Sequence, residues 1–171
     1  MGDLTFRGGV HPQEMKELSC EMPLIPYAPK GDLVFLTNQH IGKPATPVVK
    51  KGDQVLAGQC IAEAGGFVSA NIYSSVSGTV KAVEPRPTAA GGMAQAIVIT
   101  SDGANTLAEG IGQKTDYKTL SNQEIISRVQ SAGIVGMGGA GFPTHVKLTV
   151  KEPEKIRYII ANGAECEPYI T

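Results

Sequence analysis

A run of glycines is the part of this sequence whose residue types and spacing could do chemistry. Residues 136–143, here called the glycine run, read Gly-Met-Gly-Gly-Ala-Gly-Phe-Pro, and Gly136, Gly138 and Gly141 fit the spacing G-x-G-x-x-G. Glycines let the backbone approach a phosphate or a flat ring closely, and several N–H groups can point at one anion. The glycine pattern alone therefore fits either a nucleotide- or flavin-binding loop or a tight turn between helices.

The residues around the glycine run argue against two familiar phosphate-binding loops. A dinucleotide-binding G-x-G-x-x-G follows a strand and opens a helix. Here Ser121 and Glu124 stand at capping-box spacing, apolar residues follow at helical spacing, and Gly133 suits the position after a helix end. The run also lacks the Gly-Lys-Ser/Thr ending of a P-loop. We therefore expect a loop that follows a capped helix, unlike a Rossmann turn or a P-loop.

The elements that must position this loop change character along the chain. Residues 1–30 form an irregular, proline-rich lead, which we expect to wrap over the next domain because each proline removes a donor and fixes its own φ. Residues 31–101 are predicted to be all β, and residues 102–118 a polar linker. Residues 119–171 begin an α/β, Rossmann-like domain that includes a buried strand at 157–161. One strand after one or two helices is not a finished parallel sheet, so we expect a truncated domain.

The all-β part carries short strands separated by glycine turns, at the spacing typical of a small sandwich or barrel. Its pattern resembles the barrel-sandwich hybrid of biotinyl and lipoyl domains, in which a lysine at a hairpin tip carries the cofactor. The equivalent tip, residues 64–69, contains no lysine. A carrier role is therefore disfavoured, and a scaffold or docking module is expected. The predicted strands are Leu33–Leu36, Gln54–Ala57, Cys60–Ala62, Thr79–Val83 and Ala96–Ile99.

Composition narrows the function classes further. Fifteen basic and sixteen acidic residues, no Trp and 5% aromatic residues disfavour nucleic-acid binding. No segment approaches the roughly 20 apolar residues of a membrane span, and the N-terminus lacks an apolar signal region. The three cysteines have no metal-ligand spacing, and no Ser/His/Asp constellation is present. We therefore predict no catalytic side chains and no metal site in this chain, and a reducing, cytoplasmic setting.

The longer string G-x-G-G-A-G-F-P-T, followed by Lys147 and the loop 162–168, resembles the flavoprotein subunit of respiratory complex I. The chain is still more similar to the C subunits of Rnf electron-transport complexes, through the stretches 8–12, 39–42 and 67–78. These motifs occur in the family's order and cover nearly the whole chain. The resemblance implies a barrel-sandwich hybrid followed by the start of a flavin domain.

The same resemblance implies the residues that hold the cofactors. Lys147 would supply positive charge near FMN or its phosphate, and Asn162 would hydrogen-bond the flavin. Glu165 and Glu167 would accept hydrogen bonds from flavin ribityl or nicotinamide ribose hydroxyls. The FMN itself would be lined by Gly136, Gly138, Gly139, Ala140 and Gly141.

For the intact subunit, the resemblance implies electron exchange between NAD(H), FMN and two [4Fe–4S] clusters that belong to a later part of the protein. This would make it a subunit of a ferredoxin:NAD oxidoreductase coupled to ion transport, with ferredoxin or NADH as electron partner and no nucleic-acid partner. It would be peripheral, on the cytoplasmic side of the plasma membrane, beside membrane-embedded Rnf subunits. The present piece alone would be inactive. The alternative is a non-catalytic β docking module in which the glycine run is a structural turn.

Overall fold

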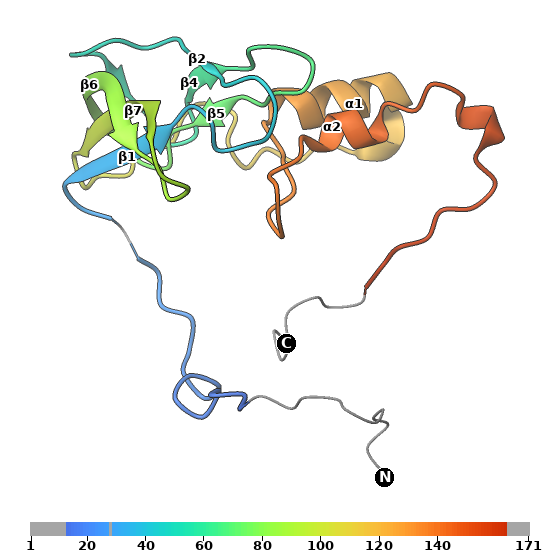
Figure 1. Cartoon of the computed structure of the whole chain (residues 1–171), viewed down its shortest axis with the longest axis horizontal. Helices are drawn as coiled ribbons and strands as arrows, with labels where there is room; N and C mark the ends of the chain where they lie inside the picture. Colours follow the sequence, from blue (N-terminus) through green and yellow to red (C-terminus); the bar gives the residue numbers. More distant parts are fainter. Residues whose placement is uncertain (1–12, 28, 164–171) are drawn as a thin grey trace. The chain divides into compact units, whose positions relative to one another are not determined.

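The computed structural model describes residues 13–27 and 29–163. The chain divides into two compact units, residues 1–26 with 152–171 and residues 27–151. All strands and α-helices found in the described residues belong to the second unit (Figure 1). The second unit therefore contains both the predicted β domain and the glycine run.

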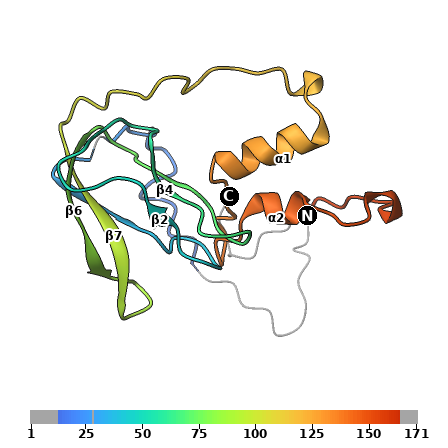
Figure 2. The same cartoon turned by 90° about the horizontal axis from the view of Figure 1, so that it is seen from above.

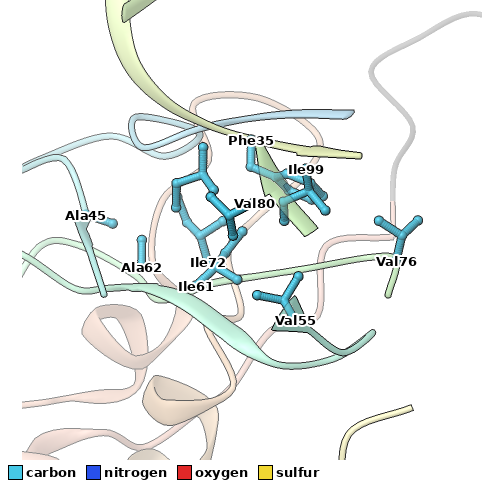
Figure 3. Close-up of a cluster of buried hydrophobic side chains, with 10 residues drawn as sticks. Phe35, Ala45, Val55, Ile61, Ala62, Ile72, Val76, Val80 and Ile99 are labelled. Carbon is cyan, nitrogen blue, oxygen red and sulfur yellow. The ribbon is translucent and has the colours of Figure 1, made fainter. Parts of the chain in front are cut away.

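Seven strands of the second unit form two antiparallel sheets. The first has the order β1-β7-β6-β3 and the second the order β2-β4-β5. Buried side chains from both sheets meet in one core, which confirms the predicted barrel-sandwich fold (Figure 3). The strands are β1 (Asp32–Leu36), β2 (Thr46–Pro47), β3 (Gln54–Val55), β4 (Cys60–Glu63), β5 (Ile72–Tyr73), β6 (Gly78–Pro87) and β7 (Met93–Ser101).

The core is aliphatic apart from one phenylalanine. Ile61, Ile97 and Ile99 are fully buried at its centre, and each such side chain contributes about 1.5–3 kcal/mol relative to an exposed one. The cluster consists of Phe35, Ala45, Val55, Ile61, Ala62, Ile72, Val76, Val80, Ile97 and Ile99.

Strand β6 begins close to its predicted start but is much longer than predicted. A bulge between Val80 and Ala82 shifts the register, so that Val80 and Val83 both pack against the core, which strict alternation would forbid. Beyond the bulge the strand includes Pro85 and Pro87, which the sequence analysis places outside it. Strand β3 pairs only with the first two residues of β6, so the later part of β6 is a sheet edge, where proline is tolerated.

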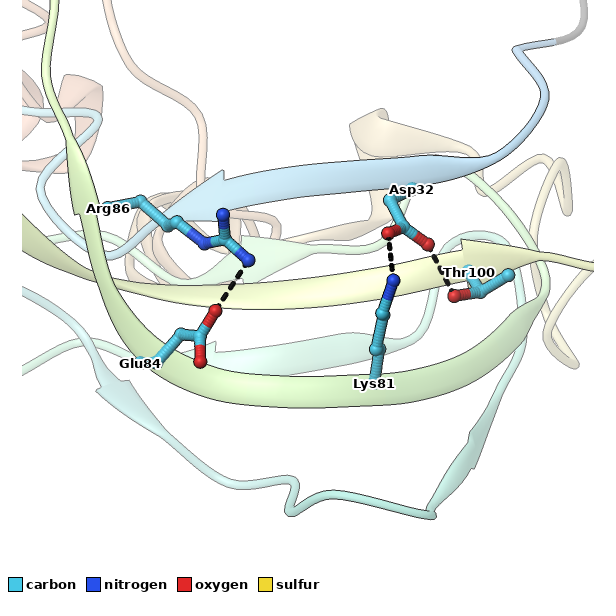
Figure 4. Close-up of polar contacts among 5 residues, drawn as sticks. All are labelled: Asp32, Lys81, Glu84, Arg86 and Thr100. Atoms are coloured by element: carbon cyan, nitrogen blue, oxygen red, sulfur yellow. Dashed lines mark hydrogen bonds and ion pairs between the residues drawn. The ribbon is translucent and has the colours of Figure 1, made fainter.

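Polar contacts cross the solvent-exposed surface of the first sheet (Figure 4). The Asp32 carboxylate accepts hydrogen bonds from Lys81 Nζ at 2.5 Å and from Thr100 Oγ1 at 2.6 Å. Further along β6, Arg86 Nη2 lies 2.5 Å from Glu84 Oε1. These contacts tie β1, β6 and β7 together outside the core.

The remaining prediction errors in the barrel concern short elements. Strands β2 and β5 are two residues long each, too short for a periodic pattern to show them. Strand β3 ends at Val55 instead of Ala57, because Ala57 pairs with the segment 106–108 outside the sheet. The segment expected to be a plain linker thus contributes backbone hydrogen bonds to the barrel.

Two α-helices complete the second unit, α1 (Asn122–Ser131) and α2 (Thr144–Leu148), preceded by the short η1 (Tyr117–Thr119). The capping box is confirmed, because Ser121 Oγ accepts from the Glu124 N–H while Glu124 Oε2 accepts from the Ser121 N–H at 2.7 Å. Gly133 follows the C-cap with φ = 66°, as expected. The two helices lie side by side (Figures 1 and 2).

The structure contradicts the predicted buried strand at 157–161. After η2 (Pro153–Lys155), these residues form no strand, and Tyr158, Ile159 and Ile160 are 84–93% exposed. A strand exists only through hydrogen bonds to a neighbour. Among the described residues, no strand pairs with this segment, so its apolar composition alone does not make it one.

Candidate functional site

The glycine run is a loop closed at its base. The Gly136 N–H donates to Phe142 O at 2.9 Å, and Val135 forms an antiparallel bridge with Pro143. Just outside this pair, the Thr144 N–H donates to Ile134 O at 2.9 Å. The loop therefore leaves the end of the α1 segment and returns into α2 through one narrow neck.

The tip of this loop is open. At Gly138 and Gly139, no atom of the described chain lies within 4 Å of the position that a Cβ would occupy. Within the described residues, the amide N–H groups of 137–140 donate no hydrogen bond to a backbone or side-chain oxygen. Such a set of unsatisfied donors on a glycine-rich backbone can bind an anion or the polar edge of a ring.

Lys147 lies at the base of the loop. Its Nζ is 5.8 Å from the centre of the Phe142 ring and would lie 3.2 Å from a Cβ placed on Gly136. The residue sits on α2, four residues after the end of the glycine run, so one helical turn brings its ammonium back over the neck. The structure thus brings the predicted Lys147 close to Gly136, the first residue of the glycine run.

A pocket of ≈ 490 Å³ lies between the loop and the barrel. This volume is within the range of small-molecule and cofactor pockets. Of the predicted site residues, Gly136, Gly139 and Gly141 line it, whereas Gly138, Ala140 and Lys147 do not. Its full lining is Gln39, His40, Ala70, Asn71, Ile72, Tyr73, Ala132, Gly133, Val135, Gly136, Met137, Gly139 and Gly141.

Sequence reasoning missed the barrel side of this pocket. Gln39, Asn71 and Tyr73 come from the loop after β1 and from the β5 region. The stretches 39–42 and 67–78, which carry the family resemblance, contain all three. The signal was therefore present, but which barrel residues meet the loop depends on tertiary packing.

Two buried histidines near the pocket have structural roles. His40 lies between strands, with Nδ1 3.1 Å from Ile41 O and Nε2 3.1 Å from Ala70 O. His145 packs edge-to-face on Phe67, and its Nε2 lies 2.9 Å from Phe67 O. These contacts give both rings a part in the packing of the barrel loops, and His40 also lines the pocket.

The remaining predicted site residues lie outside the compact unit that holds the loop. Asn162 is an exposed residue of the other unit, and Glu165 and Glu167 lie outside the described residues. In the described part of the chain, no group of three or more His, Cys, Asp or Glu side chains could hold a metal ion. None of the helices described has the length and apolar character needed to cross a membrane.

Comparison with known families finds two matches along the chain. Residues 4–104 match the RnfC barrel sandwich hybrid domain, which covers more than half of the 171 residues. Residues 129–171 match the FMN-binding domain of Nuo51. The second match begins within α1 and includes the whole glycine run.

Curated relatives match nearly the whole chain. The C subunit of the proton-translocating ferredoxin:NAD(+) oxidoreductase complex of Clostridium ljungdahlii is 50% identical over 98% of this chain. The C subunit of the Na(+)-translocating ferredoxin:NAD(+) oxidoreductase complex of Acetobacterium woodii is 46% identical over 98%. The C subunit of the ion-translocating oxidoreductase complex of Pseudomonas aeruginosa is 44% identical over 98%.

The chain spans 36%, 38% and 22% of the lengths of these three relatives. It therefore corresponds to one part of them, the barrel and the beginning of the flavin domain. The family matches and the relatives agree on one assignment, and the chain belongs to the RnfC barrel-sandwich hybrid family.

Proposed function

We propose that the protein containing this chain is the C subunit of an ion-translocating ferredoxin:NAD+ oxidoreductase complex, and that this chain supplies the first part of its flavin site. The relatives that match 98% of the chain carry this description, and residues 129–171 match an FMN-binding domain. Two [4Fe–4S] clusters would be held by the rest of the subunit, and NAD(H) and ferredoxin would be its electron partners.

The loop residues fit FMN. A bound flavin supplies the chemistry of exchanging both electron pairs and single electrons. The open amides of 137–140 would bind and orient its phosphate or the polar edge of its ring, and Gly138 and Gly139 would permit close contact because nothing occupies their Cβ positions. Lys147 would add positive charge at the neck of the loop, which favours an anionic group there.

Three further residues complete the proposed site. Asn162 would hydrogen-bond the flavin, and Glu165 and Glu167 would accept from ribityl or nicotinamide ribose hydroxyls, since carboxylates are acceptors only. The subunit would be peripheral, on the cytoplasmic side of the plasma membrane, and held there by membrane-embedded subunits of the complex. Co-purification of these membrane-embedded proteins with a tagged form of the intact protein tests that placement.

The observation that carries the flavin proposal is the open tip of the loop. A turn needs glycine where a Cβ would collide, as at Gly42 against Val68 O, or where φ is positive, as at Gly52. At Gly138 and Gly139 the space is empty and φ is not in the left-handed region, so neither reason applies. A ligand that needs this space would account for glycine there.

The test is an FMN titration of the protein made from the complete reading frame that contains this chain, followed by flavin fluorescence. A Gly139→Val change should abolish the quenching, because the branched side chain fills the space proposed for the ligand. Gly66→Val is the matched control, since a Cβ there meets only the flexible Lys43 side chain, at 3.6 Å. Unchanged FMN binding by Gly139→Val would refute the assignment of the loop.

A further inference from the structure

The barrel contacts the chain at the end of α1, a few residues before the glycine run begins. The last residue of α1 is Ser131, whose carbonyl lies in the final turn, where helix carbonyls lack intrahelical partners. This carbonyl accepts hydrogen bonds from the Tyr73 hydroxyl and from Asn71 Nδ2, the latter at 3.2 Å. Both donors come from the β5 region of the barrel, so the barrel caps the helix.

The contact continues directly after the helix. Gly133 has φ = 66°, and a Cβ at this residue would collide with the Asn71 carbonyl oxygen. Asn71 is itself fixed, because its Oδ1 accepts from the Ala64 N–H at 2.9 Å. The backbone of the barrel therefore touches the backbone of the chain three residues before the glycine run begins.

The other end of the loop is anchored to a different part of the barrel. The Ile41 N–H donates to Gly141 O at 3.4 Å, and a Cβ at Gly141 would lie 3.0 Å from Gln39 O. Further on, His145 is buried against Phe67. Both ends of the loop are thus held by barrel residues, while the tip between them is open.

Helix α1 cannot hold the loop in place by its own packing. None of its residues is buried, and its apolar side chains are only partly covered. The two hydrogen bonds to Ser131 therefore help to fix the helix end against the barrel. The same β5 region also lines the pocket beside the loop.

We infer that Tyr73 and Asn71 are positioning residues of the flavin site, which act by holding the Ser131 carbonyl and through it the glycine run. The inference rests on the proposed function for its ligand. It gives the barrel two parts in the proposed flavin site. The barrel forms one wall of the pocket and anchors the loop that would bind the cofactor. Tyr73 and Asn71 also line the pocket, but the role inferred here acts through the Ser131 carbonyl.

The decisive variant is Tyr73→Phe in the protein from the complete reading frame, because it removes one hydroxyl and keeps the ring. We expect amide hydrogen exchange of residues 132–136 to rise about fivefold, the effect of losing one net hydrogen bond. The Kd for FMN should weaken by a similar factor. Exchange in β6 and β7 and the thermal midpoint of the barrel should stay unchanged. Tyr117→Phe is the matched control, since Tyr117 is 67% exposed, and both readouts should remain at wild-type values.

Each outcome separates the inference from the function on which it rests. Wild-type exchange of residues 132–136 in Tyr73→Phe would overturn the inference, whatever happens to FMN. Faster exchange with an unchanged FMN Kd would overturn it too, because the anchored loop would then not position the flavin. If the wild-type protein does not bind FMN, the proposed function fails, while the exchange measurement still decides whether β5 anchors the loop. Gly133→Ala gives a second variant on the same contact and should show the same pattern with a larger effect.

Discussion

The barrel and the segment 121–149 belong to the same compact unit but are stabilised in different ways. The barrel closes around ten buried apolar residues of its own. In the segment 121–149, Gly141, Pro143 and His145 are the buried residues, and Gly141 and His145 owe their burial to barrel loops. The barrel should therefore survive the loss of the helical segment, whereas the helical segment depends on the barrel.

The glycines of the two regions show the same difference. Gly42 in the barrel lies against Val68 with φ = 96°, so packing and backbone conformation both require glycine there. Gly138 and Gly139 in the loop lie in open space. Turn glycines of the barrel such as Gly52 and Gly91 also lie in open space, but their positive φ favours glycine. Gly138 and Gly139 have neither a close neighbour nor a positive φ, and a binding role for the loop, as proposed above, would explain them.

The largest effect that tests this dependence comes from the barrel core. Ile97→Ala removes a fully buried side chain from the middle of β7 and should lower the free energy of unfolding by about 2–5 kcal/mol. Urea unfolding measured by circular dichroism would give this value, and hydrogen exchange should rise in the barrel and in α1 together. Met93→Ala on the same strand is the control, because Met93 is 63% exposed and its loss should change little. Retained protection in α1 would contradict the dependence.

The reverse experiment removes an anchor of the helical segment. His145→Ala deletes a buried ring and its contact with Phe67 O, and should cost about 1–3 kcal/mol of local stability. We expect faster hydrogen exchange in α1 and α2 with unchanged protection in β6 and β7. Leu148→Ala, a change at a 44% exposed position of the same helix, should have a smaller effect. A global loss of barrel stability in His145→Ala would contradict the expectation that the barrel does not depend on the helical segment.

What could be predicted from the sequence depends on how far apart the interacting residues are. The capping box at Ser121 and Glu124 involves residues three apart, and the helix it starts was predicted correctly. The edge position that allows Pro85 in β6 depends on where β3 ends, which no local pattern records. Local signals therefore predicted α1 and the longer strands of the barrel, but they missed β2 and β5, gave strand ends poorly and predicted a strand at 157–161 that the structure does not contain.

The candidate site shows the same limit. The glycine spacing and Lys147 were found from the sequence, and the structure places Lys147 beside Gly136 at the neck of the loop. The contacts of Tyr73 and Asn71 with Ser131 join residues 58 and 60 positions apart and could not be foreseen from spacing. Sequence reasoning thus found the side of the pocket that carries the motif, and the fold supplies the other side.

A smaller effect comes from the start of α1. Ser121→Ala removes the hydroxyl that accepts from the Glu124 N–H and donates to Glu124 Oε2, keeps the backbone N–H bond of the capping box, and should cost about 1 kcal/mol, confined to the helical segment. Hydrogen exchange in the first turn of α1 would measure it. Ser127→Ala, in the middle of the same helix and exposed, should be neutral or slightly stabilising because alanine is the better helix former. If both changes had the same effect, the capping box would not be the reason why the helix begins at this position.

The smallest effect lies on the barrel surface and depends on pH. Hydrogen bonds from Lys81 and Thr100 lower the pKa of the Asp32 carboxyl below 3.8, because both stabilise its charged form (Figure 4). A carboxylate with a lowered folded-state pKa contributes stability above its unfolded pKa, and that contribution is lost as the pH falls through the folded-state pKa. The difference in unfolding free energy between wild type and Asp32→Asn should therefore be greatest above pH 3.8 and should shrink below it.

In a Lys81→Met protein, the Asp32 pKa measured by NMR should move back toward 3.8, since the largest cause of the shift is gone. Because Asp32 belongs to the barrel, exchange in α1 should follow the barrel transition and show no separate step at this pKa; a separate step would mean that the helical segment senses this carboxylate directly.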